Sequence, residues 1–313
     1  MKTVKFYLAA ALIAATVMTS CSNDDEAVNS NERVEVKFSS TQASVDTRVT
    51  NDKWNGGEEI GIYMLKGNYA LTSVNISEGA GNIKYENKAN TDETEASFSQ
   101  TGNIIYYPAN QGGNEVKVKF IAYYPYGTVL DGTTTFTRAI DVSNQNDQSA
   151  IDFLYAPAAT EYDKTSGAVA LPFVHKLVKL EFTISNGAGV TEPLANGMTV
   201  TIDNQAATGT LDLTSGAVTT SNSGKTITAL TATGGATAEA IVFPVANNSS
   251  VKLMFKNDAG EEFTATVPNA ADGWAGGKKY TYTVTLKKNA TTITGTIADW
   301  GQGNGTGEGI EAE

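Results

Sequence analysis

Residues 280–286 read YTYTVTL, so an apolar or aromatic side chain alternates with threonine at every second position. Successive side chains of a β-strand point to opposite faces, and this pattern therefore predicts a strand with one buried and one polar face. Other candidate strands, separated by Gly, Asn and Asp, are residues 34–38, 60–65, 104–107, 116–124, 177–184, 198–202, 251–255 and 292–298. Since no convincing amphipathic helix accompanies them, we expect an all-β sandwich or barrel.

The candidate strands fall into two groups. Between them, residues 160–167 are polar and rich in turn-forming side chains. We place a domain boundary there, which gives one β-sandwich domain at 33–165 and a second at 166–300, both of ordinary domain size. A Gly-rich acidic tail follows at 301–313. The sequence therefore predicts two β-sandwich domains in tandem.

Residues 1–20 have the pattern of a secretory signal peptide. Lys2 and Lys5 give a basic start, and an apolar run of about 13 residues follows, too short for a membrane span of roughly 20. Small residues then precede Cys21, which is the only cysteine. A cysteine directly after the cut resembles the lipobox of bacterial lipoproteins, whose sulfur takes a lipid such as a palmitate-bearing diacylglycerol. The alternative is an ordinary signal peptide with a chance cysteine.

The residues after Cys21 extend this comparison. Residues 22–26, SNDDE, resemble the export signal that sends lipoproteins of the Bacteroides group to the outer face of the outer membrane, although an acidic linker would look the same. We expect residues 21–32 to form a flexible tether. With Cys21 acylated, no thiol remains for a disulfide, a nucleophile or a thiolate metal site. The net charge of −12 argues against nucleic acid as a partner.

The sequence gives little support for catalysis. His175 is the only histidine, and no Gly-x-Ser-x-Gly elbow accompanies it, so we expect a structural role. No pair of carboxylates stands out as the acid and base of a glycosidase. The loops at 144–147 and 257–262 carry oxygen ligands but lack the spacing of a calcium loop, and they read as turns. We therefore predict no enzyme activity, catalytic residue, metal site or cofactor.

One short pattern occurs twice. Residues 54–62, WNGGEEIGI, and 274–282, WAGGKKYTY, share a tryptophan, two glycines, two charged residues and a strand start. Glycine permits the positive φ of a tight turn, and the tryptophan can fold back to cap a sandwich edge. The sharper alternative is that Trp54 and Trp274 bind a sugar.

Several of these segments together resemble fimbrillin-like proteins of the Bacteroides group. The segments are residues 54–64, 152–156, 171–180, 274–286 and 293–300. The resemblance implies two transthyretin-like β-sandwich domains and a structural and adhesive role as a subunit of type V pili, or fimbriae. It also implies that an arginine-specific protease removes the first strand, and that a strand of a neighbouring pilin subunit fills the groove left behind. An open groove with unpaired backbone groups is suited to such strand addition.

Arg48 is the residue that matches the cleavage site. It follows the first candidate strand, residues 33–39, and precedes Trp54, so a cut there would release lipid and strand together. The protein would then move from the outer membrane surface into the pilus. Lys53 is a nearby alternative, and a cut at Arg33 would free the lipid without opening the groove. An uncut surface arginine is the remaining reading.

The C-terminus departs from the family pattern. The tail at 301–313 holds five glycines and makes a poor strand. A donor strand would have to come from Thr292, Ile293, Thr294, Gly295, Thr296, Ile297 and Ala298. Otherwise the subunit only accepts a strand, as a tip or accessory subunit would. The alternative function is a surface lipoprotein that does not polymerise and binds host or microbial glycans or proteins through exposed aromatics, with Trp54, Tyr123, Tyr124, Tyr126 and Trp274 as candidates.

Overall fold

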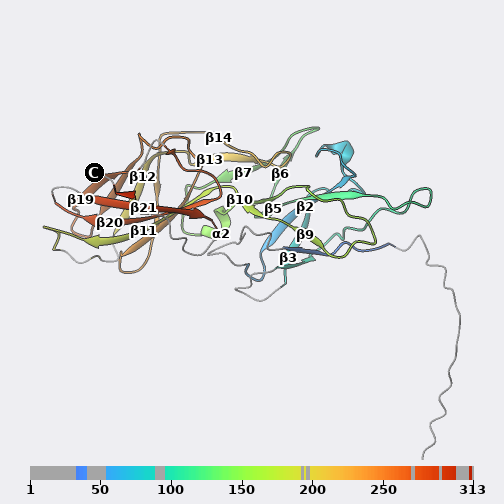
Figure 1. The fold of residues 1–313 in the computed structure, drawn as a ribbon, viewed down its shortest axis with the longest axis horizontal. Coiled ribbons are helices and arrows are strands. Elements are labelled where there is room, and N and C mark those ends of the chain that lie inside the picture. The colour runs from blue at the N-terminus through green and yellow to red at the C-terminus, as the bar shows by residue number, and fades with distance from the viewer. Residues whose placement is uncertain are drawn as a thin grey trace, which may run out of the picture.

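The structure is a computed structural model and describes residues 33–40, 54–88, 96–191, 194, 198–268, 272–288, 291–300 and 310–311. The molecule is elongated, with strands from the first half of the chain at one end and strands from the second half at the other (Figure 1). The helical segments in the described part are short: the 3-10 helix η1 Ser73–Asn75 and the α-helix α2 Gln148–Ile151. The prediction of an all-β sandwich fold is confirmed.

The described part of the chain contains no helix with the length and apolarity that crossing a membrane would require.

The first sheet has eight strands in the order β10-β8-β5-β2-β3-β4-β1-β9. They are β1 Phe38–Ser40, β2 Glu59–Lys66, β3 Ile83–Asn87, β4 Ser97–Gln100, β5 Val118–Tyr124, β8 Leu154–Ala156, β9 Val169–Leu171 and β10 Val174–His175. Neighbours are antiparallel except for β1 and β9. Strand β2 is buried on both faces, because Ile62 and Met64 belong to one core and Tyr63 and Leu65 to another.

Two further sheets form a sandwich in the second half. One has the order β16-β17-β11-β20-β21-β22 and the other β15-β12-β18-β19. The first comprises β11 Val178–Asn186, β16 Leu230–Thr231, β17 Thr237–Val242, β20 Lys278–Leu286, β21 Thr292–Asp299 and β22 Ile310–Glu311. The second comprises β12 Thr199–Gln205, β15 Lys225–Thr228, β18 Lys252–Lys256 and β19 Glu262–Thr266.

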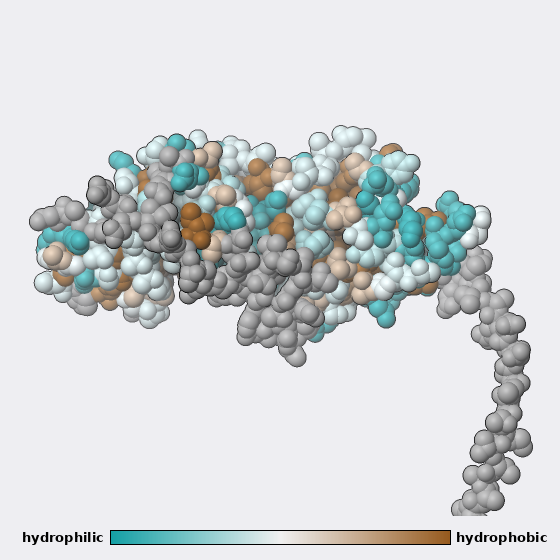
Figure 2. Space-filling view, in the orientation of Figure 1, coloured by the Kyte–Doolittle hydropathy of each residue, from teal (hydrophilic) through white to brown (hydrophobic). Residues whose placement is uncertain are grey.

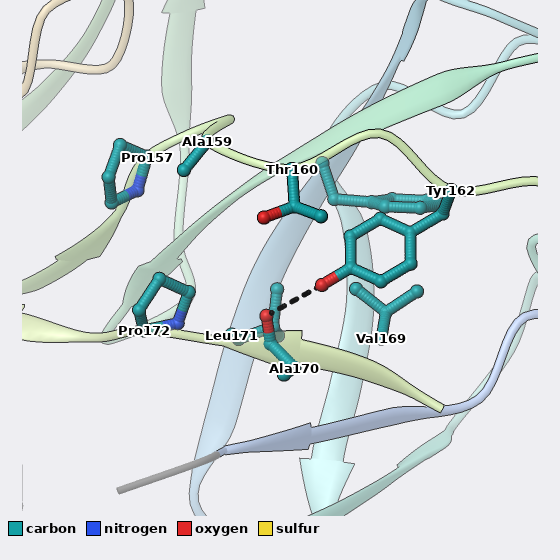
Figure 3. Close-up of a pocket in the computed structure, with 9 residues that line it drawn as sticks. Pro157, Ala159, Thr160, Tyr162, Val169, Ala170, Leu171 and Pro172 are labelled. Atoms are coloured by element: carbon teal, nitrogen blue, oxygen red, sulfur yellow. Dashed lines mark hydrogen bonds between the residues drawn. The ribbon is translucent and has the colours of Figure 1, made fainter. Parts of the chain in front are cut away.

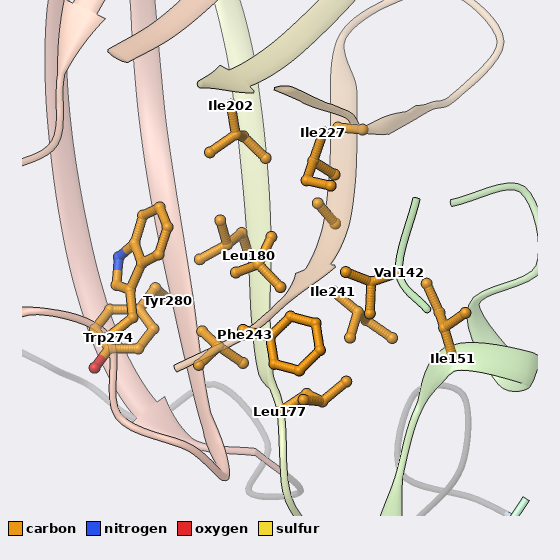
Figure 4. Close-up of a cluster of buried hydrophobic side chains, with 14 of the residues drawn as sticks. Val142, Ile151, Leu177, Leu180, Ile202, Ile227, Ile241, Phe243, Trp274 and Tyr280 are labelled. Carbon is orange, nitrogen blue, oxygen red and sulfur yellow. The ribbon is translucent and has the colours of Figure 1, made fainter. Parts of the chain in front are cut away.

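The core of this sandwich follows the predicted alternation. In β20, Tyr280, Tyr282, Val284 and Leu286 are buried, while the threonines between them lie on the other face. Phe182 from β11 lies between the sheets, with ring centroids 5.5 Å from Tyr282 and 6.1 Å from Phe255. Figure 4 shows aliphatic side chains from both sheets converging on this core, with Leu180, Ile202, Ile227 and Ile241 among those labelled.

A fourth sheet connects the two halves of the chain. Its order is β14-β13-β7-β6, and its strands are β6 Val129–Asp131, β7 Phe136–Asp141, β13 Thr208–Asp212 and β14 Val218–Thr220. Strand β7 comes from the first half and pairs with β13 from the second over five residue pairs. No alternating pattern predicted a strand in the region of β6 and β7, which is rich in Thr.

The strand pairing also bears on the domain boundary. Strands β9 and β10 lie beyond residue 165 but pair within the first sheet. The chain enters the six-stranded sheet only at β11, so the change of sheet falls between His175 and Val178. The boundary that the sequence suggested at 165 therefore does not follow the sheets, and the β7–β13 pairing crosses it. The division into two domains stays a prediction.

Apolar side chains are mostly internal. On the face drawn in Figure 2, hydrophilic and neutral colours cover most of the described surface, and the brown patches are small and separate. Among the described residues, the large apolar side chains that are exposed are Tyr69, Val74, Leu130 and Ile297.

Candidate functional site

The segment 33–40, which contains the first strand, lies between two other parts of the first sheet. On one side it runs antiparallel to β4, with Phe38 opposite Phe98, and Glu35 forms an isolated bridge with Tyr106. On the other side it runs parallel to β9, with Phe38 opposite Val169. The first strand is therefore an internal strand of the sheet rather than an edge.

Backbone hydrogen bonds hold the segment on both sides. The Val36 N–H donates to Ile105 O at 2.9 Å, and the Ser40 N–H donates to Ala96 O at 3.0 Å. On the opposite side, the Val169 N–H donates to Lys37 O at 2.7 Å. Removal of the segment would leave donors and acceptors without partners along both walls, which is unfavourable for buried backbone.

The side chains of the segment alternate as the sequence predicted. Val36 and Phe38 are almost fully buried, at 0% and 2% exposure, whereas Glu35 and Lys37 point to solvent. The Phe38 ring makes edge contacts with Tyr85 and Phe120, at centroid distances of 5.0 and 5.1 Å. The segment thus fills an apolar slot in the core of the first sheet, and Phe38 is its largest apolar side chain.

The walls of this slot are uncharged. The Ile105 N–H donates to the Tyr85 hydroxyl at 3.0 Å, and burial raises the pKa of Tyr85 to about 12. Burial likewise raises the pKa of Tyr107 to about 12. Both phenols stay neutral at physiological pH. The slot is therefore equipped to bind an extended apolar strand.

Strand β9 depends on the first strand for its pairing. It has β1 as its strand neighbour on one side, and its other side faces a cavity of about 170 Å³ (Figure 3). Phe120, Pro157 and Tyr162 line this cavity, and the Tyr162 hydroxyl donates to Ala170 O at 3.4 Å. Strand β9, the second wall of the slot, was not predicted from the sequence. Its only signal was the short apolar run at 168–171 before Pro172.

Cys21 and Arg48 lie outside the described residues, as do residues 301–309 of the tail. The described chain stops at Ser40 and resumes at Trp54, so the stretch with Arg48 directly follows the strand that fills the slot. Lipidation of Cys21 and cleavage at Arg48 stay predictions. Arg33, the alternative cleavage residue, is exposed, with its guanidinium 4.2 Å from the centre of the Tyr106 ring.

The candidate donor segment, residues 292–298, forms a strand in this structure. As β21 it pairs with β20 at eight positions, from Thr285↔Thr292 to Lys278↔Asp299, and two of its residues also pair with β22. Ile293 is buried in the sandwich core, and Ile297 is 45% exposed. A Cβ added at Gly295 would come within 2.7 Å of the Tyr282 ring, so this glycine permits close packing on an aromatic face.

The tryptophans that were candidate sugar ligands are buried. Trp54 is 0% exposed, and its ring packs on Phe98 and Phe173 at centroid distances of 5.1 and 5.4 Å. Trp274 is 1% exposed and donates from Nε1 to the Tyr282 hydroxyl at 2.8 Å. Both rings lie in the core, which is the packing role that the sequence predicted, and the alternative of a sugar-binding role is not supported by their burial.

Two of the other aromatic candidates, Tyr123 and Tyr124, are also buried. Tyr123 is fully buried and Tyr124 is 4% exposed, because the two faces of β5 pack into two different cores, while Tyr126 is half-buried. The hypothesis that the five candidate aromatic side chains are exposed for ligand binding is therefore wrong for all but the half-buried Tyr126.

His175 has the structural surroundings that the sequence suggested. Its Nδ1 lies 2.8 Å from Oδ1 of Asp152, both side chains are buried, and its ring stacks on Trp300. The partner Asp152 was not predicted from the sequence. It lies on the segment after α2, 23 residues before His175, so no local pattern connects the two residues. Within the described ranges, no group of three or more His, Cys, Asp or Glu is placed to hold a metal ion.

The two oxygen-rich loops are turns, as predicted. The Asp147 side chain caps α2 by accepting from the Ala150 N–H, and the Asn257 side chain accepts from the Glu261 N–H at 2.9 Å.

Comparison with known proteins identifies relatives along the whole chain. A family model described as fimbrillin-like matches residues 47–300. A Bacteroides uniformis protein named "Putative fimbrium subunit Fim1C" is 35% identical over 312 residues, which cover 98% of each chain. These relatives are fimbrial rather than enzymatic, in agreement with the prediction that the chain is not an enzyme.

Solved structures agree with this result. A crystal structure of a "putative cell adhesion protein" from Bacteroides uniformis is 33% identical, with a TM-score of 0.71, and the match covers 86% of this chain and 98% of that one. Another "putative cell adhesion protein", from Bacteroides ovatus, has the same fold at 23% identity, with a TM-score of 0.58 and coverage of 87% and 98%. The chain therefore belongs to the fimbrillin-like family.

Proposed function

We propose that this chain is a fimbrial subunit that reaches the cell surface as a lipoprotein, loses its first strand by cleavage after Arg48, and then accepts a strand from a neighbouring subunit. The observation that carries this proposal is the position of segment 33–40. It is the described part of the chain that precedes Arg48, and it fills a slot between β4 and β9 in the first sheet.

The energetic consequence of cleavage supports strand exchange. Burial of Val36 and Phe38 contributes about 1.5–3 kcal/mol for each side chain. Loss of both, together with the backbone bonds on two sides, is comparable with the roughly 5–15 kcal/mol that stabilises a whole domain. A subunit without this segment therefore has a strong tendency to bind another strand in the same place.

The extent of the family match agrees with a division of the chain near Arg48. The matched region begins at residue 47, beside Arg48, and leaves segment 33–40 outside. The sequence before it holds the signal peptide and Cys21. We propose that the lipid at Cys21 anchors the precursor to the outer membrane only until an arginine-specific protease acts.

We propose that the subunit accepts a strand but does not donate one, as suits a tip or accessory position. Donation by residues 292–298 would require breaking seven residue pairs with β20 and withdrawing Ile293 from the core. An incoming strand that restores the pairing of β1 would run parallel to β9 and antiparallel to β4, with apolar side chains at alternate positions that match Val36 and Phe38.

Mass measurement of protein sheared from cells tests the processing step. We expect a new N-terminus at Val49 in assembled material and an acylated Cys21 in Arg48→Ala. Arg33→Ala and Lys53→Ala are matched controls that should be processed normally. Pili of normal length that contained uncut Arg48→Ala subunits would contradict the proposal.

A peptide with the sequence of residues 33–40 tests the slot directly. After cleavage at Arg48, the peptide should rebind and prevent the subunit from joining a growing polymer. A peptide in which Phe38 is replaced by Glu should not, because it would place a charge between Tyr85 and Phe120. Equal inhibition by both peptides would show that the slot is not where subunits join.

A further inference from the structure

A second cavity, of about 390 Å³, lies between the loop after β2 and the turn that joins β13 to β14. The residues that line it include Asn68, Tyr69, Lys119, Tyr155, Thr214 and Ser215. The volume falls in the range of roughly 300–1,000 Å³ that is usual for small-ligand sites. Neither the lipid anchor nor the strand slot uses this cavity.

Two aromatic rings border the cavity, and they differ in exposure. Tyr69 is 64% exposed, the only tyrosine among the described residues that solvent reaches to this extent. Tyr155 is buried and fixed, because its hydroxyl donates to Leu213 O at 3.1 Å and Gly216 packs against its ring. The fixed Tyr155 ring therefore forms an inner wall of the cavity, and the exposed Tyr69 ring lies at its opening.

The polar groups of the cavity are hydroxyls, an amide and one ammonium. The hydroxyls of Thr214 and Ser215 donate to the Asp212 carboxylate at 2.6 and 2.7 Å. The Ser215 oxygen also accepts from the Ala217 N–H at 3.2 Å, so the Thr214 oxygen is the better placed acceptor for a ligand. Lys119 Nζ donates to Asn68 Oδ1 at 2.6 Å, a neutral partner. Lys119 is the one charged residue in the lining, although the chain as a whole has a net charge of −12.

We propose that this cavity binds an acidic sugar, a pyranose ring that carries a carboxylate. The apolar C–H face of such a ring matches the exposed face of Tyr69, and its hydroxyls match the Thr214 oxygen and the Asn68 amide. Its carboxylate matches the Lys119 ammonium. A phosphorylated ligand fits less well, because Lys119 alone would face the two negative charges of a phosphate group.

The test uses the purified uncut chain, so its result does not depend on cleavage or assembly. Saturation-transfer NMR and calorimetry with N-acetylneuraminic acid and glucuronic acid should detect binding, and glucose and N-acetylglucosamine should bind more weakly. Tyr69→Ala should weaken binding of the acidic sugars roughly tenfold. Lys119→Gln should remove the preference for them over the neutral sugars.

Val74→Ala is the matched control, because Val74 is 70% exposed and does not line the cavity, and binding should be unchanged in it. Tyr69 is exposed, so Tyr69→Ala should keep the thermal stability of the parent. Absence of binding by either acidic sugar, equal binding of acidic and neutral sugars, or unchanged affinity in Tyr69→Ala would each overturn the proposal.

Discussion

The imidazole of His175 lies flat against the indole of Trp300, with ring centroids 4.0 Å apart and an angle of 6° between the ring planes. His175 ends β10 in the first sheet, whereas Trp300 directly follows β21 in the six-stranded sheet. The backbone N–H of Trp300 also donates to Gly277 O, in the turn that precedes β20. This contact is therefore one of the places where the two halves of the molecule are packed together.

Replacement of Trp300 by Ala should destabilise the protein by about 3–5 kcal/mol, because a buried indole is lost from this junction. Urea denaturation followed by far-UV circular dichroism measures the change. Trp300→Phe keeps an aromatic ring against His175 and should lose much less. A loss below about 1 kcal/mol in Trp300→Ala would mean that the stacking contributes little to the stability of the junction.

Glu58 should make the stability depend on pH. Burial raises the pKa of its carboxyl from 4.5 to about 7, against the opposing effect of hydrogen bonds from Asn55. The folded protein therefore holds this proton more tightly than the unfolded chain does. The resulting stabilisation is fully present below pH 4.5 and is lost as the pH rises through about 7.

The measurement is the free energy of unfolding at pH 5 and pH 8. After allowance for solvent screening at a partly exposed group, Glu58 should account for about 1–2 kcal/mol of the decrease between them. Glu58→Gln should remove that part, and it should be more stable than the parent at pH 8. The exposed Glu161 provides the control, since Glu161→Gln should leave the pH profile unchanged. An identical profile in Glu58→Gln would contradict the assignment.

The sequence predicted local alternation well and distant pairing poorly. Segments such as 34–38 and 280–286 alternate because one face is buried, so their strands could be read directly. Strand β9 has three residues, and β7 joins a strand from the other half of the chain. Neither partner is visible in a local pattern, because pairing is set by the tertiary arrangement. The sequence therefore predicted a groove left by removal of the first strand, but it did not predict that β9 forms the second wall of that groove.

The side chain of Gln145 makes one of these distant connections. Its Nε2 donates to Val142 O at 2.7 Å and to Ile241 O at 2.9 Å, and its Oε1 accepts from the Ile241 N–H at 2.8 Å. One amide thus satisfies both backbone groups of Ile241 in β17. Short-range sequence patterns offer no signal for such a contact.

Gln145→Leu should cost about 2–4 kcal/mol, because it leaves a buried N–H and C=O of Ile241 without partners. Chemical denaturation measures the loss, and hydrogen exchange should show the Ile241 amide opening faster. Ser143→Ala, at an exposed position nearby, should be close to neutral. Unchanged protection of the Ile241 amide in Gln145→Leu would show that water replaces the side chain without cost.

Phe38 and Lys37 provide the most direct comparison at the strand slot. In the uncut chain, Phe38→Ala removes the ring that contacts Tyr85 and Phe120, and it should destabilise the first sheet by about 3–5 kcal/mol. Lys37→Ala changes an exposed side chain and keeps the backbone hydrogen bond that the Val169 N–H donates to Lys37 O, so its effect should be small.

Hydrogen exchange at the β9 amides is the decisive measurement for this pair. Because β9 has β1 as its strand partner, a loosened first strand should raise the exchange rate of Val169 in Phe38→Ala but not in Lys37→Ala. The amides of β20, in the other sandwich, should exchange as in the parent. If β9 kept full protection in Phe38→Ala, the slot would hold its shape without the strand, and cleavage would not create the driving force that strand exchange requires.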